Sequence, residues 1–259
     1  MNVFRMNAEK MLAAVDVEFT PIRECTVKEY GSPERIAQEI RQYLRLPRGR
    51  VENMTQTIER FGVIVIPYNF NNRKFSGASL TLESGSYFVF INSGMPPDRW
   101  RFTLAHELGH IIMHNVTTPD DPTEKEADRF AAEFLMPEMD VYSYLQRVSL
   151  DSLASLKLYW RTSMASLLEK SHNLGTITDK QHRNLWQQMG LRGYRVQEPK
   201  ELDPPKETPV LLKEILDFHL EELEFTPKTL SDRFCIELED FDEIYSTRKK
   251  HLRLVSQAT

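Results

Sequence analysis

The sequence lacks most of the features that mark secreted, membrane-bound or disulfide-rich proteins. Its two cysteines, Cys25 and Cys235, lie far apart without metal-ligand spacing, so we expect isolated thiols. No apolar run approaches the roughly 18 residues of a membrane span. Residues 1–19 lack the continuous apolar stretch of a signal peptide. These absences predict a cytoplasmic protein without a membrane partner.

A strong excess of charge of one sign is absent as well. The 259 residues carry a formal net charge of −5, with 27% charged and 41% hydrophobic residues, which is typical of a globular protein. Residues 139–200 are mildly basic and residues 201–259 are acidic, but neither excess indicates nucleic-acid binding by itself. Internal repeats and low-complexity tracts are also missing. The length of the chain suits one large or two small domains.

Hydrophobic periodicity in the first half of the chain predicts an α+β fold with a small antiparallel or mixed sheet. Ser32 is the expected N-cap of a helix at 33–46. Asp98 is the expected N-cap of the helix that follows the loop at 92–97. Helices are expected at 33–46, 51–60 and 123–135, and strands at 63–66, 75–82 and 86–91, the last two joined by a turn at 83–85.

After Pro137 the sequence predicts a mostly helical region. Four prolines between 198 and 209 then mark the clearest boundary in the chain. We therefore expect a metallopeptidase-like part at 1–138, a helical part at 139–198, and a proline-marked linker with a small helical unit at 199–259. The expected helices are 150–159, 163–173, 178–189, 210–224, 229–234 and 238–245.

One motif carries chemistry, namely the H-E-x-x-H string at 106–110, flanked by apolar residues that suit a buried helix. Positions i and i+4 share a helix face, so His106 and His110 can direct ring nitrogens at one ion. Glu107 lies beside that face, where it can accept a proton from water. The spacing predicts a zinc site with two histidine ligands, one further protein ligand and an open position. The ligand types also allow manganese or iron.

The pattern leaves the third ligand open. His114 continues the i+4 series but lies roughly 12 Å from His106 along a helix axis, so it suits a supporting position behind a ligand better. The acidic candidates share the next expected helix. Glu126 and Glu133 lie on its inward stripe, Glu124 fits a charge placed near the helix N-terminus, and Asp128 can accept the second N–H of a ligand histidine.

Two segments together resemble the ImmA/IrrE metallopeptidases. They are RFTLAHELGH at 101–110 and EADRFAAEFLMP at 126–137, and the stretches LKLYWRTSMASL at 156–167 and LGTI at 174–177 resemble the region that follows in that family. The resemblance covers roughly residues 30–200. It implies a zincin-like domain with Glu126 as the third ligand. The residues before Pro33 are too few for the XRE-type DNA-binding domain that often precedes it, so we expect the stand-alone form.

The resemblance also implies an activity. A member of this family would be a zinc endopeptidase that cleaves a DNA-binding repressor of the XRE type and so derepresses genes of a mobile element or a stress response. A peptide substrate could add as a strand beside residues 86–91. Tyr68, Tyr142, Tyr144 and His172 are candidates for stabilising the oxyanion, and nothing in the sequence selects among them.

A second hypothesis comes from a different class. The chain could be a regulatory binding protein whose zinc site is structural or vestigial and which acts by contact with a protein or with DNA. Residues 153–168 have the outline of a helix-turn-helix, but no cluster of Lys and Arg marks a recognition face, so direct DNA binding is not favoured. The intact Glu107 favours the peptidase, since its loss is the expected mark of an inactive enzyme.

Overall fold

The computed structural model describes residues 19–70, 72, 75–81, 85–114, 121–221, 225–234 and 238. The chain divides into two compact units. The larger comprises Phe19–Thr81 and Gly85–Pro209, and the smaller contains the described residues from Val210 on. The division expected at 138/139 and 198/199 stays a prediction. An expected helix at 238–245 lies outside the described residues, apart from Leu238.

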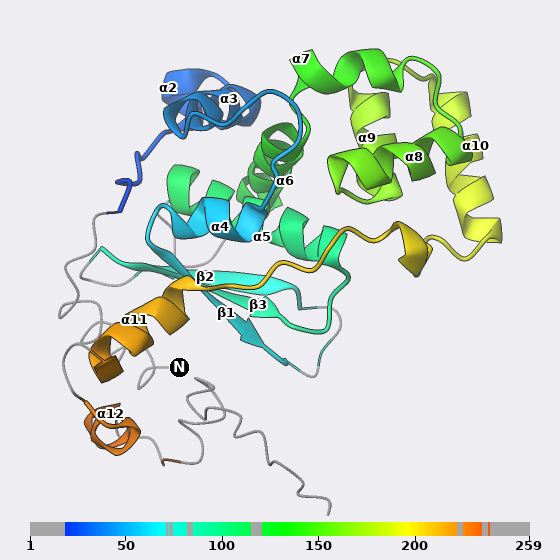
Figure 1. The fold of residues 1–259 in the computed structure, drawn as a ribbon. Coiled ribbons are helices and arrows are strands. Elements are labelled where there is room, and N and C mark those ends of the chain that lie inside the picture. Colours follow the sequence, from blue (N-terminus) through cyan, green and yellow to red (C-terminus); the bar gives the residue numbers. More distant parts are fainter. Residues whose placement is uncertain are drawn as a thin grey trace, which may run out of the picture. The chain divides into compact units, whose positions relative to one another are not determined.

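In the described part of the chain, the strands β1 (Val63–Tyr68), β2 (Gly77–Thr81) and β3 (Tyr87–Asn92) form one mixed sheet in the order β1-β3-β2 (Figure 1). β3 is the central strand, parallel to β1 and antiparallel to β2. Val65 and Ser79 both lie opposite Val89. The expected α+β fold with a small mixed sheet is confirmed, and β2 is left as an edge strand.

Helices α4 (Met54–Glu59) and α5 (Pro97–Met113) cover one face of the sheet. On the far side of α5 packs α6 (Asp121–Leu135), and α3 (Pro33–Tyr43) packs against α6 (Figure 1). The core between these layers is aliphatic and aromatic. It includes Val65 and Val89 from the sheet, Leu108 from α5 and Phe130 from α6. The short α2 (Val27–Tyr30) precedes α3.

The start of α5 differs from the sequence prediction. Asp98 is not its N-cap, because the helix begins at Pro97 after Pro96, which offers no side-chain cap. The Asp98 carboxylate instead lies 2.6 Å from the buried ammonium of Lys157. An acidic side chain in the first turn of a helix also interacts favourably with the helix dipole. The expected cap of α3 is confirmed, since Ser32 accepts a hydrogen bond from the Arg35 N–H.

The region after α6 is helical, as predicted. α7 (Glu138–Val141) and the 3-10 turn η1 (Tyr142–Leu145) lead to α8 (Leu150–Trp160), α9 (Met164–Asn173) and α10 (Asp179–Leu191). Each of the last three begins at a hydroxyl N-cap, Ser149, Ser163 or Thr178. Between α8 and α9 the chain turns at Arg161, which has a φ of 56°. Trp160 is fully buried and packs in the core.

Residues 198–207, which we call the strap, are anchored to the rest of the larger unit by two carboxylates, of Glu198 and Glu207. Glu198 accepts hydrogen bonds from Lys157 and from the Met164 and Ala165 N–H groups at the start of α9. Glu207 accepts them from the Met54 and Thr55 N–H groups at the start of α4. Glu207 also pairs with Arg101 of α5. The strap, which contains the 3-10 turn η2 (Lys200–Leu202), is therefore tied to four helices, α4, α5, α8 and α9.

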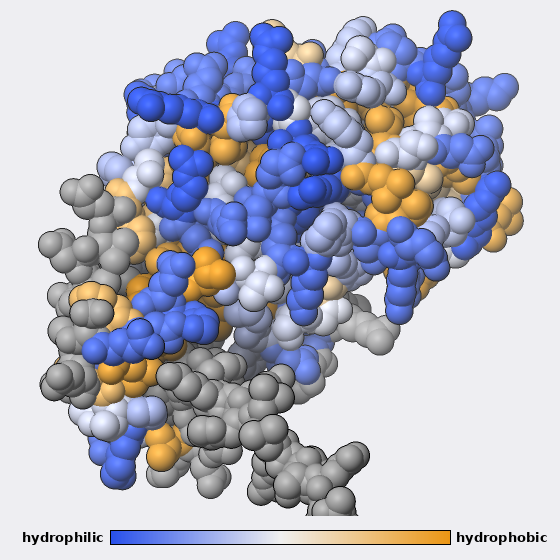
Figure 2. Space-filling model, in the orientation of Figure 1, coloured by the Kyte–Doolittle hydropathy of each residue, from blue (hydrophilic) through white to orange (hydrophobic). Residues whose placement is uncertain are grey.

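The smaller unit contains α11 (Leu211–Glu221) and α12 (Pro227–Phe234), which agree with helices expected at 210–224 and 229–234. Leu211, Ile215 and Leu216 form the buried stripe of α11. Within the described residues, no helix combines the length and apolar character needed to cross a membrane. On the face drawn in Figure 2, hydrophilic side chains predominate and apolar ones form separate patches.

Candidate metal centre

The motif histidines lie on the buried helix α5, as the spacing predicts. His106 and His110 are one helical turn apart, and their Nε2 atoms approach to 3.0 Å. Residue 109, between them, is a glycine, and α6 passes close to it. A Cβ at this position would lie 3.0 Å from the Phe130 ring and 3.4 Å from Ala127 Cα. The absence of a side chain at Gly109 thus lets α6 approach α5 closely.

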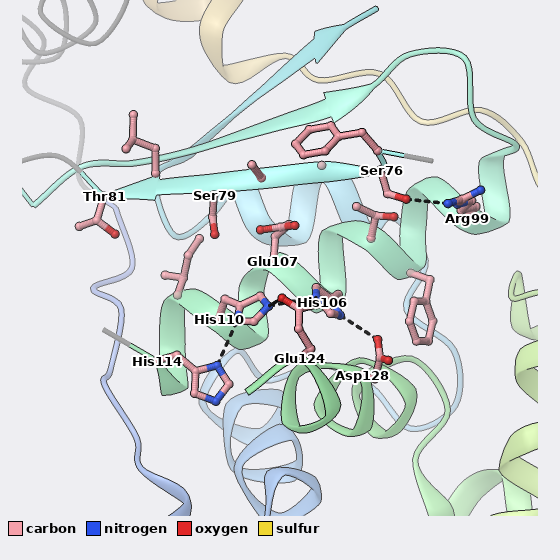
Figure 3. A pocket seen from close by; sticks show the side chains of 17 residues that line it. Ser76, Ser79, Thr81, Arg99, His106, Glu107, His110, His114, Glu124 and Asp128 are labelled. Carbon is pink, nitrogen blue, oxygen red and sulfur yellow. Dashed lines mark hydrogen bonds and ion pairs between the residues drawn. The ribbon is translucent and has the colours of Figure 1, made fainter. Parts of the chain in front are cut away.

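Helix α6 adds a carboxylate to the two imidazoles. The Glu124 oxygens lie 3.3 Å from His106 Nε2 and 3.4 Å from His110 Nε2, and the three ligand atoms all fall within 4.8 Å of one another. Tetrahedral zinc with bonds of about 2.0–2.2 Å separates its ligand atoms by roughly 3.3–3.6 Å. Two imidazoles and one carboxylate at these separations therefore fit a zinc ion (Figure 3).

Further polar groups contact the outer nitrogens of both histidines. Asp128 Oδ1 lies 2.8 Å from His106 Nδ1. His114 Nδ1 lies 3.0 Å from His110 Nδ1, and on its other side His114 Nε2 lies 2.9 Å from Glu126. Such outer partners hold a ligand imidazole in one tautomer and orientation. His106 therefore has a carboxylate behind it, and His110 has an imidazole with a carboxylate behind that.

The pKa values of the two histidines are shifted in opposite directions. For His110, burial and the neighbouring positive charges of His106 and His114 lower the pKa from 6.5 to about 4. For His106, burial also disfavours the charged form, but the hydrogen bond to Asp128 and nearby carboxylates outweigh it, so its pKa is raised. His110 is thus neutral at neutral pH, which is the form that binds a metal.

Glu107 points from α5 towards the edge strand β2 (Figure 3). Burial raises the pKa of its carboxyl group, while hydrogen bonds from the side chain and backbone of Ser79 oppose that shift. Gly77 lets the strand come close, since a Cβ there would lie 3.0 Å from both Phe90 O and Thr103 Cγ2, and 3.6 Å from Glu107 Oε1. A carboxyl group with a raised pKa suits proton transfer near neutral pH.

A pocket of about 770 Å³ opens over these groups. Its walls are the edge strand with the residues just before it (Phe75–Thr81), one face of α5, and Glu124 and Asp128 of α6 (Figure 3). The expectation that a substrate strand pairs beside residues 86–91 is wrong, because β3 already pairs with β1 and β2 on its two sides. The strand that faces the pocket is β2.

The structure does not bring every predicted residue into the cluster of ligand atoms. His106, Glu107 and His110 meet there, but the Glu126 carboxylate lies against His114 instead. Glu133 is buried and pairs with Lys170. The four oxyanion candidates from the sequence, Tyr68, Tyr142, Tyr144 and His172, are not among the residues that line the pocket. Sequence reasoning missed Ser79, which has no motif of its own.

A second group of metal-ligand residue types lies between α9 and α10. It consists of Glu169, His172 and His182. The two imidazole rings are stacked, with centroids 4.1 Å apart and planes 13° apart. Because nitrogen lone pairs lie in the ring plane, stacked rings do not direct them at one point between them. This group fits a metal less well than the cluster on α5 and α6.

Comparison with known proteins agrees with the site. The match covers residues 58–172, which include β1, the edge strand, α5 and α6, and it is to the family model Peptidase_M78, described as an IrrE N-terminal-like domain. No curated protein matches the chain. Residues 58–172 of this chain are therefore a metallopeptidase domain of the ImmA/IrrE type.

Proposed function

We propose that this chain is a zinc-dependent endopeptidase whose metal ligands are His106, His110 and Glu124. The observation that carries the proposal is the convergence of two Nε2 atoms and a carboxylate at separations of 3.0 to 3.4 Å. Glu124 takes the place of Glu126, which the resemblance implied, because the carboxylate of Glu126 meets His114. Zinc bound at this site supplies a Lewis acid for the scissile carbonyl and makes water more acidic.

The chain's own groups then have separate roles. Glu107, beside the two histidines, accepts a proton from the attacking water and delivers it to the leaving amine. Asp128 holds His106 with its Nε2 towards the metal site, and His114 does the same for His110. The edge strand β2 offers main-chain groups along the pocket, which supports binding of an extended peptide.

The proposed substrate is a DNA-binding repressor of the XRE type in the cytoplasm. This part of the proposal is supported by the resemblance of the chain to ImmA/IrrE metallopeptidases. Cleavage of such a repressor would release genes of a mobile element or a stress response. The long edge-strand wall of the pocket suits a segment of a protein chain.

The test is the Glu107→Gln variant. It should retain zinc, since Glu107 is not a proposed ligand, and lose roughly 10²- to 10⁴-fold in kcat/KM for repressor cleavage, because the proton acceptor is gone. Zinc content and the rate of repressor cleavage are measured together. Glu138→Gln is the matched control, because Glu138 is exposed on α7 and outside the pocket lining. Full cleavage, or full in-cell function, of Glu107→Gln would favour the binding-protein hypothesis.

A further inference from the structure

Arg99 lies at one end of the pocket, on the same side of α5 as the metal-site histidines. It is exposed, it lines the pocket, and its Nη2 donates a hydrogen bond of 2.7 Å to Ser76 Oγ (Figure 3). Seven residues separate it from His106, which corresponds to roughly 10 Å along the helix axis. The guanidinium is therefore too far away to act on the scissile bond but near enough to meet another part of a bound peptide.

Among the residues that the structure describes, no carboxylate neutralises the charge of Arg99. No Lys and no other Arg lines the pocket among the described residues, and no described carboxylate pairs with the Arg99 side chain. Arg101, two residues further on, differs from Arg99 in that it is buried and paired with Glu207. The remaining charged groups that line the pocket are the carboxylates of Glu107, Glu124 and Asp128, together with histidines. Apart from the metal site, a carboxylate entering this pocket thus has one favourable place to bind.

The edge strand sets the direction of a bound peptide. The Asn92 N–H donates to the Ser76 carbonyl, so Ser76 and Asn92 form a hydrogen-bonded pair. Hydrogen-bonded and non-hydrogen-bonded pairs alternate along antiparallel strands. The backbone N–H and C=O groups of Gly77, Ser79 and Thr81 therefore point away from β3. A peptide that pairs antiparallel with this edge runs from the Thr81 end to the Ser76 end. Its residues after the scissile bond therefore extend towards Arg99.

We propose that Arg99 forms a carboxylate-binding subsite that selects an acidic group about three residues after the scissile bond. At about 3.3–3.4 Å per residue, three residues of an extended peptide span the roughly 10 Å between His106 and Arg99. The ligand is an Asp or Glu side chain or the C-terminal carboxylate of a peptide. A guanidinium fork binds either one through charge-assisted hydrogen bonds. This proposal rests on the proposed endopeptidase function.

The experiment uses a library of synthetic 12-residue peptides and the full-length, zinc-loaded chain. Cleavage sites are read by mass spectrometry, and KM and kcat are measured for the best peptide with Glu, Gln or Lys at the third position after the cut. Wild type should favour Glu over Gln by about tenfold, mainly through KM. Arg99→Gln should lose this preference and Arg99→Glu should shift it to Lys. The control Arg183→Gln changes an exposed arginine on α10 and should keep it.

Further arms separate the remaining outcomes. Peptides with a C-terminal acid or amide, cut three residues from the end, tell a terminal carboxylate from a side chain. Binding of the uncleaved Glu peptide to zinc-loaded Glu107→Gln, with and without Arg99→Gln, should weaken about tenfold in the double variant. Cleavage without an acidic preference, or a preference that survives in Arg99→Gln, would overturn the subsite. If wild type cut no peptide and no repressor, the proposed function itself would fail and this subsite with it.

Discussion

His110 is the residue whose ionisation is most constrained by its surroundings. It is buried on α5 between His106 and His114, with ring-nitrogen contacts of 3.0 Å to each. A proton on His110 would therefore sit next to two other imidazoles in a site that water reaches poorly. This is why the pKa of His110 is lowered from 6.5 to about 4.

The lowered pKa predicts that the metal-free protein loses stability in acid. In the unfolded chain His110 binds a proton near pH 6.5, whereas in the folded chain it does so only near 4. Between these values the unfolded state binds more protons, so the free energy of unfolding falls as pH is lowered through this window, by roughly 3 kcal/mol at most. Urea denaturation of metal-free wild type and His110→Gln at pH 7 and pH 4.5 measures the effect.

The pH range of this effect distinguishes His110 from His106. The raised pKa of His106 gives a contribution that is complete below about 6.5 and declines only as pH rises through its folded pKa. His110→Gln should therefore flatten the slope between pH 6.5 and 4 specifically. If the free energy of unfolding of His110→Gln fell with pH as steeply as that of wild type, protonation of His110 would not be what destabilises the folded chain.

Single residues show what a sequence can place. The relative positions of His106, Glu107 and His110 could be predicted because they are set within about one helical turn, and they do not depend on the rest of the fold. Glu124 could not be separated from Glu126, because the choice depends on how α6 crosses α5. Arg99 and Ser79 gave no signal, since their relation to the site arises only when β2 lies beside α5.

At the scale of elements, the rotation of α6 about its axis brings Glu124, the proposed third ligand, to the two histidines. Glu124 and Asp128 are four residues apart and share one side of the helix, which faces His106. Glu126 is two residues from each, so it lies about 200° around the axis and meets His114. The inward stripe through Phe130 and Phe134 correctly shows that Glu126 faces α5, but not which imidazole it reaches.

This rotation of α6 predicts different metal contents for two single variants. Glu124→Ala should lose tight zinc binding, as should His110→Ala, because each removes a proposed ligand. Glu126→Ala should retain about one zinc per chain, with affinity reduced no more than the roughly 10- to 100-fold typical of an outer partner. Zinc is measured by elemental analysis and by titration against a chelator. Retention in Glu124→Ala with loss in Glu126→Ala would restore the ligand that the resemblance implied.

The elements differ in how far their own residues specify them. α8, α9 and α10 could be predicted closely because Ser149, Ser163 and Thr178 cap them through local hydrogen bonds. The strands were also recognisable, but their order was not. Whether the segment 86–91 lies in the middle or at the edge depends on the parallel pairing of β3 with β1, which is a contact between distant segments.

At the scale of the whole molecule, the strap joins the parts of the larger unit. Its carboxylates meet two buried cations, because Glu198 and Asp203 lie 2.9 and 3.0 Å from Lys157 and Glu207 pairs with Arg101. Arg101 belongs to α5, the helix that carries the metal-site histidines. The four prolines between 198 and 209 predicted a linker, and composition alone could not show that its carboxylates would pair with buried cations.

The last prediction concerns where the chain can be cut. A chain ending at Pro209 keeps the strap and all described residues of the larger unit's hydrophobic cluster. It should fold and bind zinc like the full chain. A chain ending at Gln197 lacks Glu207, the ion-pair partner of Arg101, and also Glu198 and Asp203, which pair with Lys157. Breaking a buried ion pair costs about 3–5 kcal/mol, which is a large share of the roughly 5–15 kcal/mol that stabilises a domain.

Urea denaturation and zinc titration of both truncated chains give the measurement, and Glu207→Gln in the full chain serves as the single-residue counterpart. Glu201→Gln is its control, because Glu201 is exposed in the strap. Glu207→Gln should lose stability and Glu201→Gln should not. Equal stability of the two truncated chains would mean that Lys157 and Arg101 find other partners when the strap is removed. In that case the strap would cover the larger unit without holding α5 in place.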